Sequence, residues 1–435
     1  MTEFNKNEEK TDTNVRGYLV FLVGQWISMF GSNVVGFSII WFLTVTTGST
    51  FVLGLATFLN FAPFIIATPV AGVFIDRWSR KKVIAFVDFM QAFFTVVLIG
   101  FFLMDVFSPL ELVAILLTLN TIRALFGAFH TSAVDTLLPI MVPKKHYSRI
   151  NGINYLVNGI IGGIAGPIIG AYTLEVLLIP LKTILWLDVI TFLVAILPTV
   201  LIYFPKVKKR VLDEKEKTSF KSEFSEGMKF IKETPGLFAL LFVFAGANLF
   251  MTPFYIQLPL FVTAIHLGGA SQLAFLLTAQ QSGMLIGSIV MSTWKGFENH
   301  AKGVALALFM GYFGFAIMVS APFGYFALIG IGLFIAGFTL PAANVSSEAI
   351  WASTVPQEIL GRVYAVRRTL AQITAPLAML LSGIIAEFIN LSLVLLVCTV
   401  CGLLVLGYSW FFTKLPEVEK MIEINEKTKI QPTPS

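Results

Sequence analysis

The hydrophobic pattern of the chain is a succession of long apolar segments separated by short polar ones. A helix that crosses a bilayer needs about 20 mostly apolar residues, and twelve segments reach that length. They lie at about 18–47, 50–75, 83–104, 110–136, 150–174, 183–204, 237–265, 272–294, 303–320, 323–349, 363–388 and 391–413. The pattern therefore predicts six membrane helices, a polar break and six more.

The composition favours a membrane protein over a large soluble helical one. Hydrophobic residues make up 56% of the 435 residues, charged residues make up only 13%, and phenylalanine occurs 42 times. A soluble protein of this size could not hide so much apolar surface in its core. The polar start Met1–Val15 and the length of the first apolar segment argue against a cleaved signal peptide. We expect that segment to be the first membrane helix.

The distribution of Lys and Arg predicts the orientation of the helices. With twelve helices, these residues fall in the termini, in the loops of one side or in the adjacent helix ends, and only Arg123 and Lys182 do not. Cytoplasmic loops retain positive charge. We therefore expect a multi-pass protein of the cell membrane with both termini cytoplasmic. The net charge of +5 reflects this topology and does not indicate nucleic-acid binding.

The polar break predicts the organisation into domains. We expect an N-terminal six-helix half at 1–204, a cytoplasmic linker at 205–235, a C-terminal six-helix half at 236–414 and a cytoplasmic tail at 415–435. Within the linker, the segment Phe220–Ile231 has apolar residues at helical spacing, which is typical of a helix lying along the membrane surface. A linker without secondary structure explains that segment equally well.

The two halves carry a faint repeat. The stretch "VPKKHYSRI" at 142–150 and the stretch "VPQEILGRV" at 355–363 share Val-Pro and an arginine, Arg149 or Arg362. Each stretch leads into the fifth helix of its half. Parallel halves around a midplane cavity are the architecture of a large class of secondary transporters. The expected fold is an all-α membrane protein with twelve transmembrane helices in two six-helix halves.

A dense charge cluster lies between the second and third predicted helices. In Gly72–Lys82, "GVFIDRWSRKK", one acid is followed by four cations within six residues. An aspartate can accept hydrogen bonds at a helix N-terminus, and arginines pair with acids on neighbouring helix ends. We expect Arg80 to pair with Asp135. A simple membrane anchor would explain the cations but neither the aspartate nor the glycine.

This cluster resembles the loop 2–3 signature of the major facilitator superfamily, Gly-x-x-x-Asp-Arg-x-x-Arg-Lys-Lys. Ser79 stands where that family usually has glycine. The resemblance implies the major facilitator fold and a cytoplasmic gate that opens and closes during transport. To this gate we assign Gly72, Asp76, Arg77, Arg80, Lys81, Asp135 and Arg362, and Lys82 completes the signature.

A glycine-rich stretch, "GGIAGPIIG", lies in the fifth predicted helix. It contributes Gly162, Gly166, Pro167 and Gly170 and resembles the Gly-x-x-x-Gly-Pro-x-x-Gly motif of antiporters in the superfamily. Small residues four positions apart let another helix approach closely. Tight packing alone therefore explains the motif as well as a direct role in antiport does.

Several motifs together resemble a narrower family. "IRALFGAFHT" in the fourth helix, an aspartate in the sixth and "LGRV" before the eleventh are similar to the macrolide-efflux-type drug:proton antiporters. That family also includes exporters of siderophores and other amphiphiles. The resemblance implies an exporter that exchanges protons for a small amphiphilic substrate.

Charged residues within the predicted helices are the candidates for proton coupling. An isolated charge at the bilayer centre costs at least ~2.5–3.5 kcal/mol, so each should face a cavity or a partner. Arg123 shares a helix face with His130, Asp188 is the leading acid, and Asp88 is the next. For each of the four, a purely structural pairing is the alternative.

Other polar and aromatic residues within the helices could line a substrate cavity. An aromatic residue in a membrane helix more often faces lipid or packs between helices, so each is a weak prediction. The residues chosen are Gln25, Trp26, Ser32, Asn248, Tyr255, Gln280 and Gln372.

Missing motifs narrow the function further. The sequence has no phosphate-binding loop for ATP and no room for a soluble catalytic domain, so we expect neither an ATP-driven pump nor an enzyme. The only cysteines, Cys398 and Cys401, have no further ligands nearby in sequence, and four histidines form no cluster. We expect no metal and no cofactor.

The sequence thus predicts a secondary active exporter of an amphiphilic compound, drug-like or macrolide-like, driven by proton antiport through alternating access. We expect it to work as a monomer in the lipid bilayer. Import, or transport of a siderophore or lipid-like amphiphile, is an alternative. A membrane sensor or scaffold that has kept the fold without transport is another.

Overall fold

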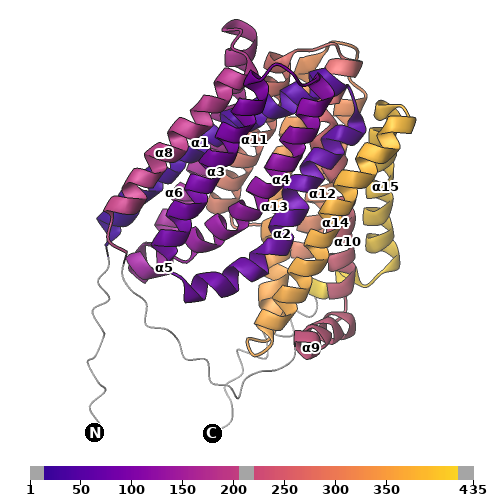
Figure 1. Cartoon of the computed structure of the whole chain (residues 1–435). Coiled ribbons are helices and arrows are strands. Elements are labelled where there is room, and N and C mark those ends of the chain that lie inside the picture. Colours follow the sequence, from indigo (N-terminus) through magenta and orange to yellow (C-terminus); the bar gives the residue numbers. More distant parts are fainter. Residues whose placement is uncertain (1–13, 205–219, 420–435) are drawn as a thin grey trace, which may run out of the picture. The chain divides into compact units, whose positions relative to one another are not determined.

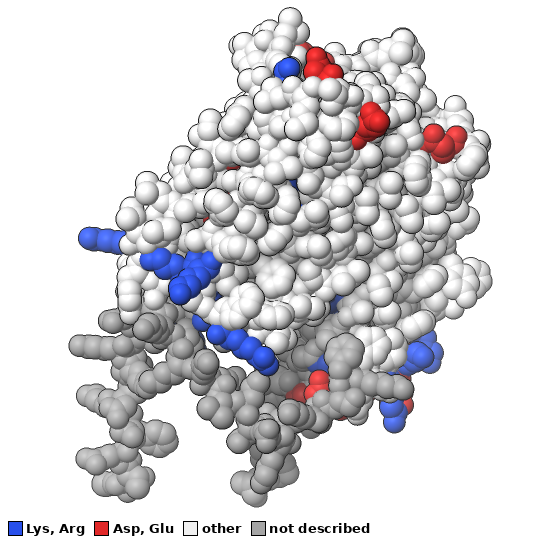
Figure 2. Space-filling view, in the orientation of Figure 1, with Lys and Arg blue, Asp and Glu red and all other residues white. Residues whose placement is uncertain are grey.

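The computed structural model describes residues 14–204 and 220–419 (Figure 1). Within these ranges all regular secondary structure is helical, and twelve helical segments are long and apolar enough to cross a membrane. The all-α, twelve-helix fold predicted from the hydrophobic pattern is confirmed. The face shown in Figure 2 is nearly free of charged side chains along these helices, as a hydrocarbon solvent requires.

The membrane-crossing helices begin and end within a few residues of the predicted segments. The first six spans comprise α1 (Val15–Thr47), α2 (Thr50–Arg77), α3 (Arg80–Leu103), α4 (Pro109–Asp135), the composite α6 (Tyr147–Ile160), η2 (Ile161–Ala165), α7 (Gly166–Ala171) and η3 (Tyr172–Val176), and α8 (Leu181–Leu201). The other six comprise α10 (Leu237–Leu260) with η5 (Phe261–Ile265), α11 (Ala270–Thr293), α12 (His300–Val319), α13 (Phe326–Thr354), α14 (Leu360–Phe388) and α15 (Leu391–Phe412). Shorter helices are α5 (Leu138–Met141), η1 (Lys144–His146), α9 (Phe220–Glu233) and η6 (Leu415–Glu417).

Local sequence explains the helix ends and the irregular fifth span. At the start of α4, Ser108 and Glu111 form a capping box, and Pro109 occupies the first turn, where its missing N–H is not needed. In the fifth span, the π-helical turn η2 ends at Ala165, two residues before Pro167. Because proline has no N–H to donate, the wider turn absorbs the break in the backbone ladder.

The chain divides into two compact units. One comprises Met1–Ile39 and Leu59–Val211, and the other comprises Ile40–Phe58 and Leu212–Ser435. We call them the N-terminal and C-terminal units. The division therefore falls within α1 and α2 as well as after the sixth span. The end of α1 and the start of α2 pack with the C-terminal unit.

Each unit has its own packing core. In the N-terminal unit, α3 packs against α4 and α8, and a cluster of fully buried side chains includes Phe21, Ile84 and Met141. In the C-terminal unit, α13 packs against α11 and α12. Glycines let the backbones of those helices approach, because a Cβ at Gly337 would meet the backbone of α11.

The predicted amphipathic segment forms α9. Its Ile231 is fully buried, its Gly227 lies against the backbone of Arg362 in α14, and Glu226 pairs with Arg362 at 2.7 Å. Of the two predicted alternatives for this segment, a helix and a linker without secondary structure, the structure shows the helix. Its inner face packs on the protein, because α14 offers both an apolar contact and a cation.

Candidate functional site

Asp188 and Arg123 form an ion pair in the middle of the N-terminal unit. Arg123 in α4 donates from Nη2 to Oδ2 of Asp188 in α8 at 2.5 Å. The side chain of Asp188 is completely buried, and that of Arg123 is 13% exposed. Each charge supplies the partner that the other needs in a low-dielectric surrounding. The structure thus brings together the two residues that the sequence singled out first.

Two hydroxyl groups complete the surroundings of Asp188. Ser32 in α1 donates to Oδ1 at 2.7 Å, and Thr95 in α3 lies 3.0 Å from Oδ2. Four helices therefore converge on one carboxylate. Ser32 was predicted as a cavity residue, whereas Thr95 was not predicted at all.

The guanidinium group of Arg123 does not use all of its hydrogen-bond donors within the described part of the chain. Its guanidinium carbon lies 5.9 Å from the ring centre of Phe192, one turn after Asp188 on α8. Its Nε is buried and has no hydrogen-bond partner among the described residues. The guanidinium therefore retains an unused donor beside the ion pair, which a rearranged site could use.

A second acid and base pair lies in the same unit. Nε2 of His130 in α4 is 3.1 Å from Oδ1 of Asp88 in α3, and Asp88 is completely buried. Neither carboxylate oxygen of Asp88 has a well-aligned hydrogen bond within the described part of the chain. The His130 imidazole is therefore the polar group that the structure places nearest to this buried carboxylate.

A cavity of about 400 Å³ lies in the N-terminal unit beside both pairs. Four of the predicted residues line it, namely Gln25, Trp26, Ser32 and His130, together with Asp135 from the predicted gate. Ser32 connects the cavity to Asp188, and His130 connects it to Asp88. Each buried acid thus lies one side chain behind the cavity wall.

The cavity wall mixes apolar and polar groups. Aromatic rings of Phe64 and Phe192 lie among amide and hydroxyl side chains, and the indole N–H of Trp26 donates to Asn154 at 2.9 Å. Nε2 of Gln25 is buried and has no partner among the described residues. Four further lining residues were not predicted, because single amides and hydroxyls in apolar helices carry no spacing signal; they are Gln91, Thr131, Asn154 and Asn158.

The loop 2–3 cluster makes different contacts from those predicted. Nε of Arg80 donates to Oγ1 of Thr136 at 2.9 Å, and no ion pair joins Arg80 to Asp135 in the described part of the chain. The hydroxyl oxygen of Thr136 lies within hydrogen-bonding distance of Arg80 and satisfies this donor without an acidic partner. Lys81 donates to the carbonyl of Ile202 at 2.9 Å. The side chain of Asp76 lies outside the described residues.

The glycines of the fifth span face α1. A Cβ at Gly166 would meet Asn33, a Cβ at Gly170 would meet Phe37, and Gly162 also lies beside Asn33. This close approach accounts for the helix 5 motif by packing. It sets the position of α1, which carries Ser32, against the fifth span.

The predicted cavity residues of the C-terminal unit are mostly engaged in helix packing. Asn248 donates to the carbonyl of Ala371 at 2.9 Å, and the ring of Tyr255 contacts that of Phe315. Gln280 lies at the close approach of α11 and α13, with its carbonyl beside Gly337. The side chain of Gln372 lies outside the described residues.

Two further acids of the C-terminal unit have several partners each. Glu348 in α13 receives Nη1 of Arg367 and the hydroxyl of Tyr364 from α14, both at 2.6 Å. Glu387 at the end of α14 accepts hydrogen bonds from the hydroxyl of Thr50 and from the amide of Phe51, the first two residues of α2. Glu387 was not predicted, because it lies at the end of an apolar helix, where its sequence context is that of an ordinary loop residue.

Comparison with known proteins places these features in a family context. Residues 21–333 match the model of the Major Facilitator Superfamily. Macrolide efflux protein A of Streptococcus pyogenes is 27% identical over 386 residues, which cover 88% of this chain and 93% of that protein. The multidrug efflux pump Tap of Mycolicibacterium fortuitum is 23% identical over 425 residues, 94% of this chain and 98% of its own.

Solved structures of transporters share the fold. A bacterial homologue of the iron transporter ferroportin, crystallised in an inward-facing state, superposes with a TM-score of 0.71 at 13% identity. The match covers 91% of this chain and 98% of that one. At this identity the likeness concerns the arrangement of helices and carries no information on the substrate.

Proposed function

Because this chain belongs to the Major Facilitator Superfamily, we propose that it is a secondary active exporter of an amphiphilic compound, driven by proton antiport through alternating access. Like the relatives that it matches, the chain is a multi-pass membrane transporter. It is not an enzyme. The names of two relatives, a macrolide efflux protein and a multidrug efflux pump, support a drug-like or macrolide-like substrate. The charge pattern supports a place in the cell membrane with both termini cytoplasmic.

The observation that carries the proposal is the buried ion pair of Arg123 and Asp188. An ionised carboxylate holds the guanidinium, and a protonated one gives up most of that hold. A proton bound at Asp188 therefore frees Arg123, and loss of the proton recaptures it. One equilibrium then links proton binding to the position of a cation beside the cavity.

Thr95 allows the site to accept both protonation states. Its Oγ1 lies 3.0 Å from Oδ2 of Asp188 and 3.0 Å from the carbonyl of Gln91. A hydroxyl has one hydrogen to donate and lone pairs to accept. When Asp188 is ionised, Thr95 donates to it. When Asp188 is protonated, its O–H donates to Oγ1 of Thr95. The hydroxyl of Thr95 then donates to the carbonyl of Gln91.

The pair of His130 and Asp88 provides a second place for a proton in the same unit. His130 lines the cavity, and Asp88 is buried behind it. A proton arriving at the imidazole therefore has an acid within 3.1 Å. We assign this pair a supporting role in proton coupling.

The mixed wall of the cavity supports an amphiphilic substrate. Aromatic rings provide apolar contact area, while amides and hydroxyls offer a few directional hydrogen bonds. Within the C-terminal unit, Asn248, Tyr255, Gln280 and Gln372 remain the proposed substrate contacts, which requires Asn248 and Tyr255 to leave the packing contacts described above.

The loop 2–3 cluster is the proposed cytoplasmic gate. Its cations and Asp76 lie at the turn between α2 and α3, with Gly72 on the last turns of α2. We include Arg362, which pairs with Glu226 of α9, and Asp135 at the end of α4. The expected cycle breaks and remakes these contacts.

Transport by purified protein in liposomes tests the proposal. Vesicles with an acidic interior should accumulate a radiolabelled macrolide or an amphiphilic dye, and a protonophore should abolish the accumulation. ATP should have no effect. Accumulation that follows a sodium gradient without a pH gradient would contradict proton antiport, and absence of transport across a broad panel of amphiphiles would favour a sensor or scaffold.

A matched pair of variants assigns the acid. Asp188→Asn removes the buried charge, and Asp105→Asn makes the same change in an exposed loop, where the left-handed backbone also suits asparagine. Only the first should lose its response to the pH gradient. Equal responses of both variants would move the coupling role to another acid.

A further inference from the structure

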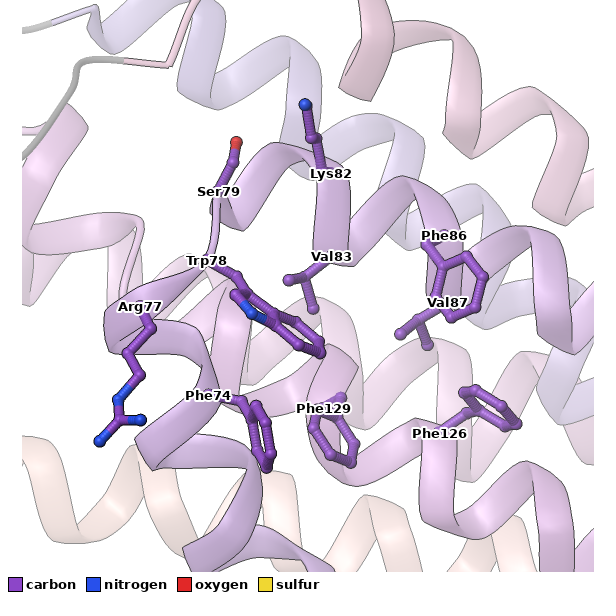
Figure 3. Close-up of a pocket in the computed structure, with 10 residues that line it drawn as sticks. All are labelled: Phe74, Arg77, Trp78, Ser79, Lys82, Val83, Phe86, Val87, Phe126 and Phe129. Atoms are coloured by element: carbon purple, nitrogen blue, oxygen red, sulfur yellow. The ribbon is translucent and has the colours of Figure 1, made fainter.

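A large apolar groove lies outside the site described above, where α2 ends and α3 begins. Its volume is about 650 Å³, and α4 forms its far wall. Figure 3 shows the rings of Phe74, Trp78, Phe126 and Phe129 converging on its floor, with Phe86 along one side. Trp78 and Phe86 are each more than half exposed. On a membrane protein such exposed rings contact lipid, and their gathering in one groove offers an acyl chain a concave apolar surface.

The four cations of the loop 2–3 cluster fall into two classes at this groove. Arg80 and Lys81 are bound to the protein, through Thr136 and the carbonyl of Ile202. Arg77 and Lys82 line the groove, are exposed, and have no hydrogen bond or ion pair from their side chains within the described residues. Figure 3 shows both extending away from the rings, in different directions, with Lys82 on the side of Ser79.

We propose that this groove binds an anionic phospholipid of the leaflet that faces the loop 2–3 side. The phosphate lies at the margin beside Ser79 and Lys82, with Arg77 at the opposite margin, and the glycerol and the upper acyl chain cover the rings. Charge complementarity fixes the sign of the headgroup, and the apolar floor requires a hydrocarbon portion. The proposal is independent of the transported substrate and of proton coupling.

The order of groups along the groove matches that of a phospholipid. Phe86 follows Lys82 by one helical turn on α3, which places it about 6 Å deeper at 1.5 Å per residue. Trp78 lies between the cations and the deeper rings, at the level where tryptophan is enriched in membrane proteins. Cations therefore meet the headgroup region, and rings meet the hydrocarbon below it.

The start of α3 adds to the attraction of a phosphate. Ser79 occupies the N-cap but makes no side-chain capping bond, and the first turn contains no acid. The hydroxyl and the first amides of the helix are therefore available to an anion. A free phosphate would use only this part of the groove and would leave the rings uncovered, so the lipid accounts for more of what is seen.

Native mass spectrometry of the full-length protein tests the proposal. Wild-type protein in detergent is titrated with phosphatidylglycerol or with phosphatidylcholine of the same acyl chains. We expect at least one phosphatidylglycerol to stay bound at energies that remove phosphatidylcholine. The variant Arg77→Gln/Lys82→Gln should reduce phosphatidylglycerol binding about tenfold. The matched variant Lys144→Gln/Lys145→Gln, which removes two exposed cations from loop 4–5, should bind as the wild type does.

A second measurement locates the lipid. Phosphatidylglycerol with a quenching label high on its acyl chain should quench wild-type fluorescence more than that of Trp78→Phe, and the double groove variant should lose this difference. Equal loss of lipid from both double variants, or no preference for phosphatidylglycerol, would overturn the proposal. So would displacement of the labelled lipid by glycerol phosphate alone, which would identify a site for the headgroup only. Unchanged melting temperatures verify that the variants are folded.

Discussion

The hydroxyl of Ser32 donates to Oδ1 of Asp188 at 2.7 Å, and Ser32 itself lines the cavity of the N-terminal unit. A single side chain thus separates a completely buried acid from a space that can hold ligand. Any event in the cavity that moves α1 alters the hydrogen bonding of the acid. Any change in the charge of the acid alters the wall of the cavity.

Replacement of Ser32 tests this connection. Ser32→Ala removes one hydrogen bond to a charged acceptor, and such bonds contribute about 1.5–3 kcal/mol. We expect the variant to retain its fold but to lose part of its pH-driven transport, because the carboxylate of Asp188 loses the donor that connects it to the cavity. Ser28→Ala, also in α1 and at the cavity, is the control and should transport as the wild type does.

Breaking the ion pair of Arg123 and Asp188 should lower the thermal stability of the protein, whatever its effect on transport. Removing one partner of a buried pair costs about 3–5 kcal/mol, because the other charge remains without compensation. We expect Arg123→Gln to melt at a clearly lower temperature and to lose active efflux. The double variant Arg123→Gln/Asp188→Asn carries no net buried charge and should recover much of the melting temperature without recovering efflux. Recovery of both would mean that the pair is structural only.

Variants of Thr95 test whether its hydroxyl exchanges hydrogen-bond partners or only fills space. Thr95→Val keeps the shape but can neither donate to Asp188 nor accept from it, whereas Thr95→Ser keeps both abilities. We expect valine to reduce pH-driven transport about tenfold and serine to retain most of it. Thr118→Val is the control, because that hydroxyl donates only to a carbonyl of its own helix. Similar transport by the valine and serine variants would exclude the exchange.

The prediction of the fold from sequence succeeded because its signals are local. Each membrane helix is a continuous apolar segment, and the loops between them are short, so length and hydropathy place the boundaries within a few residues. The predicted amphipathic segment formed α9 for the same reason. Its packing on α14 could not be predicted, since Gly227 and Arg362 are far apart in the sequence.

The prediction of the candidate site was partial for a physical reason. Arg123, Asp188, Asp88 and His130 are recognisable because charge is rare and costly within a membrane. Their pairing depends on which helices are neighbours, and hydropathy does not reveal that. Thr95 was missed because a hydroxyl within a helix usually bonds to its own backbone, and nothing in its sequence context distinguishes it.

Glu387 should stabilise the start of α2 within the C-terminal unit. Its carboxylate receives the hydroxyls of Ser49 and Thr50 at 2.9 Å and the amide of Phe51 at 3.1 Å. It therefore acts as a helix cap supplied from a distant part of the chain, and caps contribute about 0.5–2 kcal/mol. We expect Glu387→Ala to lower the melting temperature by several degrees. Glu358→Ala, in an exposed turn, should not, and an equal effect of both would argue against the cap.

His266 should make the stability of the C-terminal unit sensitive to acid. Its ring is 4% exposed, contacts the ring of Phe261, and accepts the amide of Gly324 at Nδ1 over 3.1 Å. Burial lowers the pKa of His266 below its usual 6.5, because a charged ring loses its hydration there. Protonation of Nδ1 would also remove the acceptor that Gly324 uses.

The sign of the effect follows from the direction of that shift. Above pH 6.5 the ring is neutral in folded and unfolded chains alike, so its contribution to stability is complete. Below 6.5 the unfolded chain binds the proton first, and stability falls by at most about 1.4 kcal/mol per pH unit until the folded pKa is reached. We expect wild-type protein to lose melting temperature between pH 7 and pH 5, and His266→Gln to lose less over the same range. His300→Gln is the control and should follow the wild type. Parallel curves for all three proteins would show that other groups govern the response to acid.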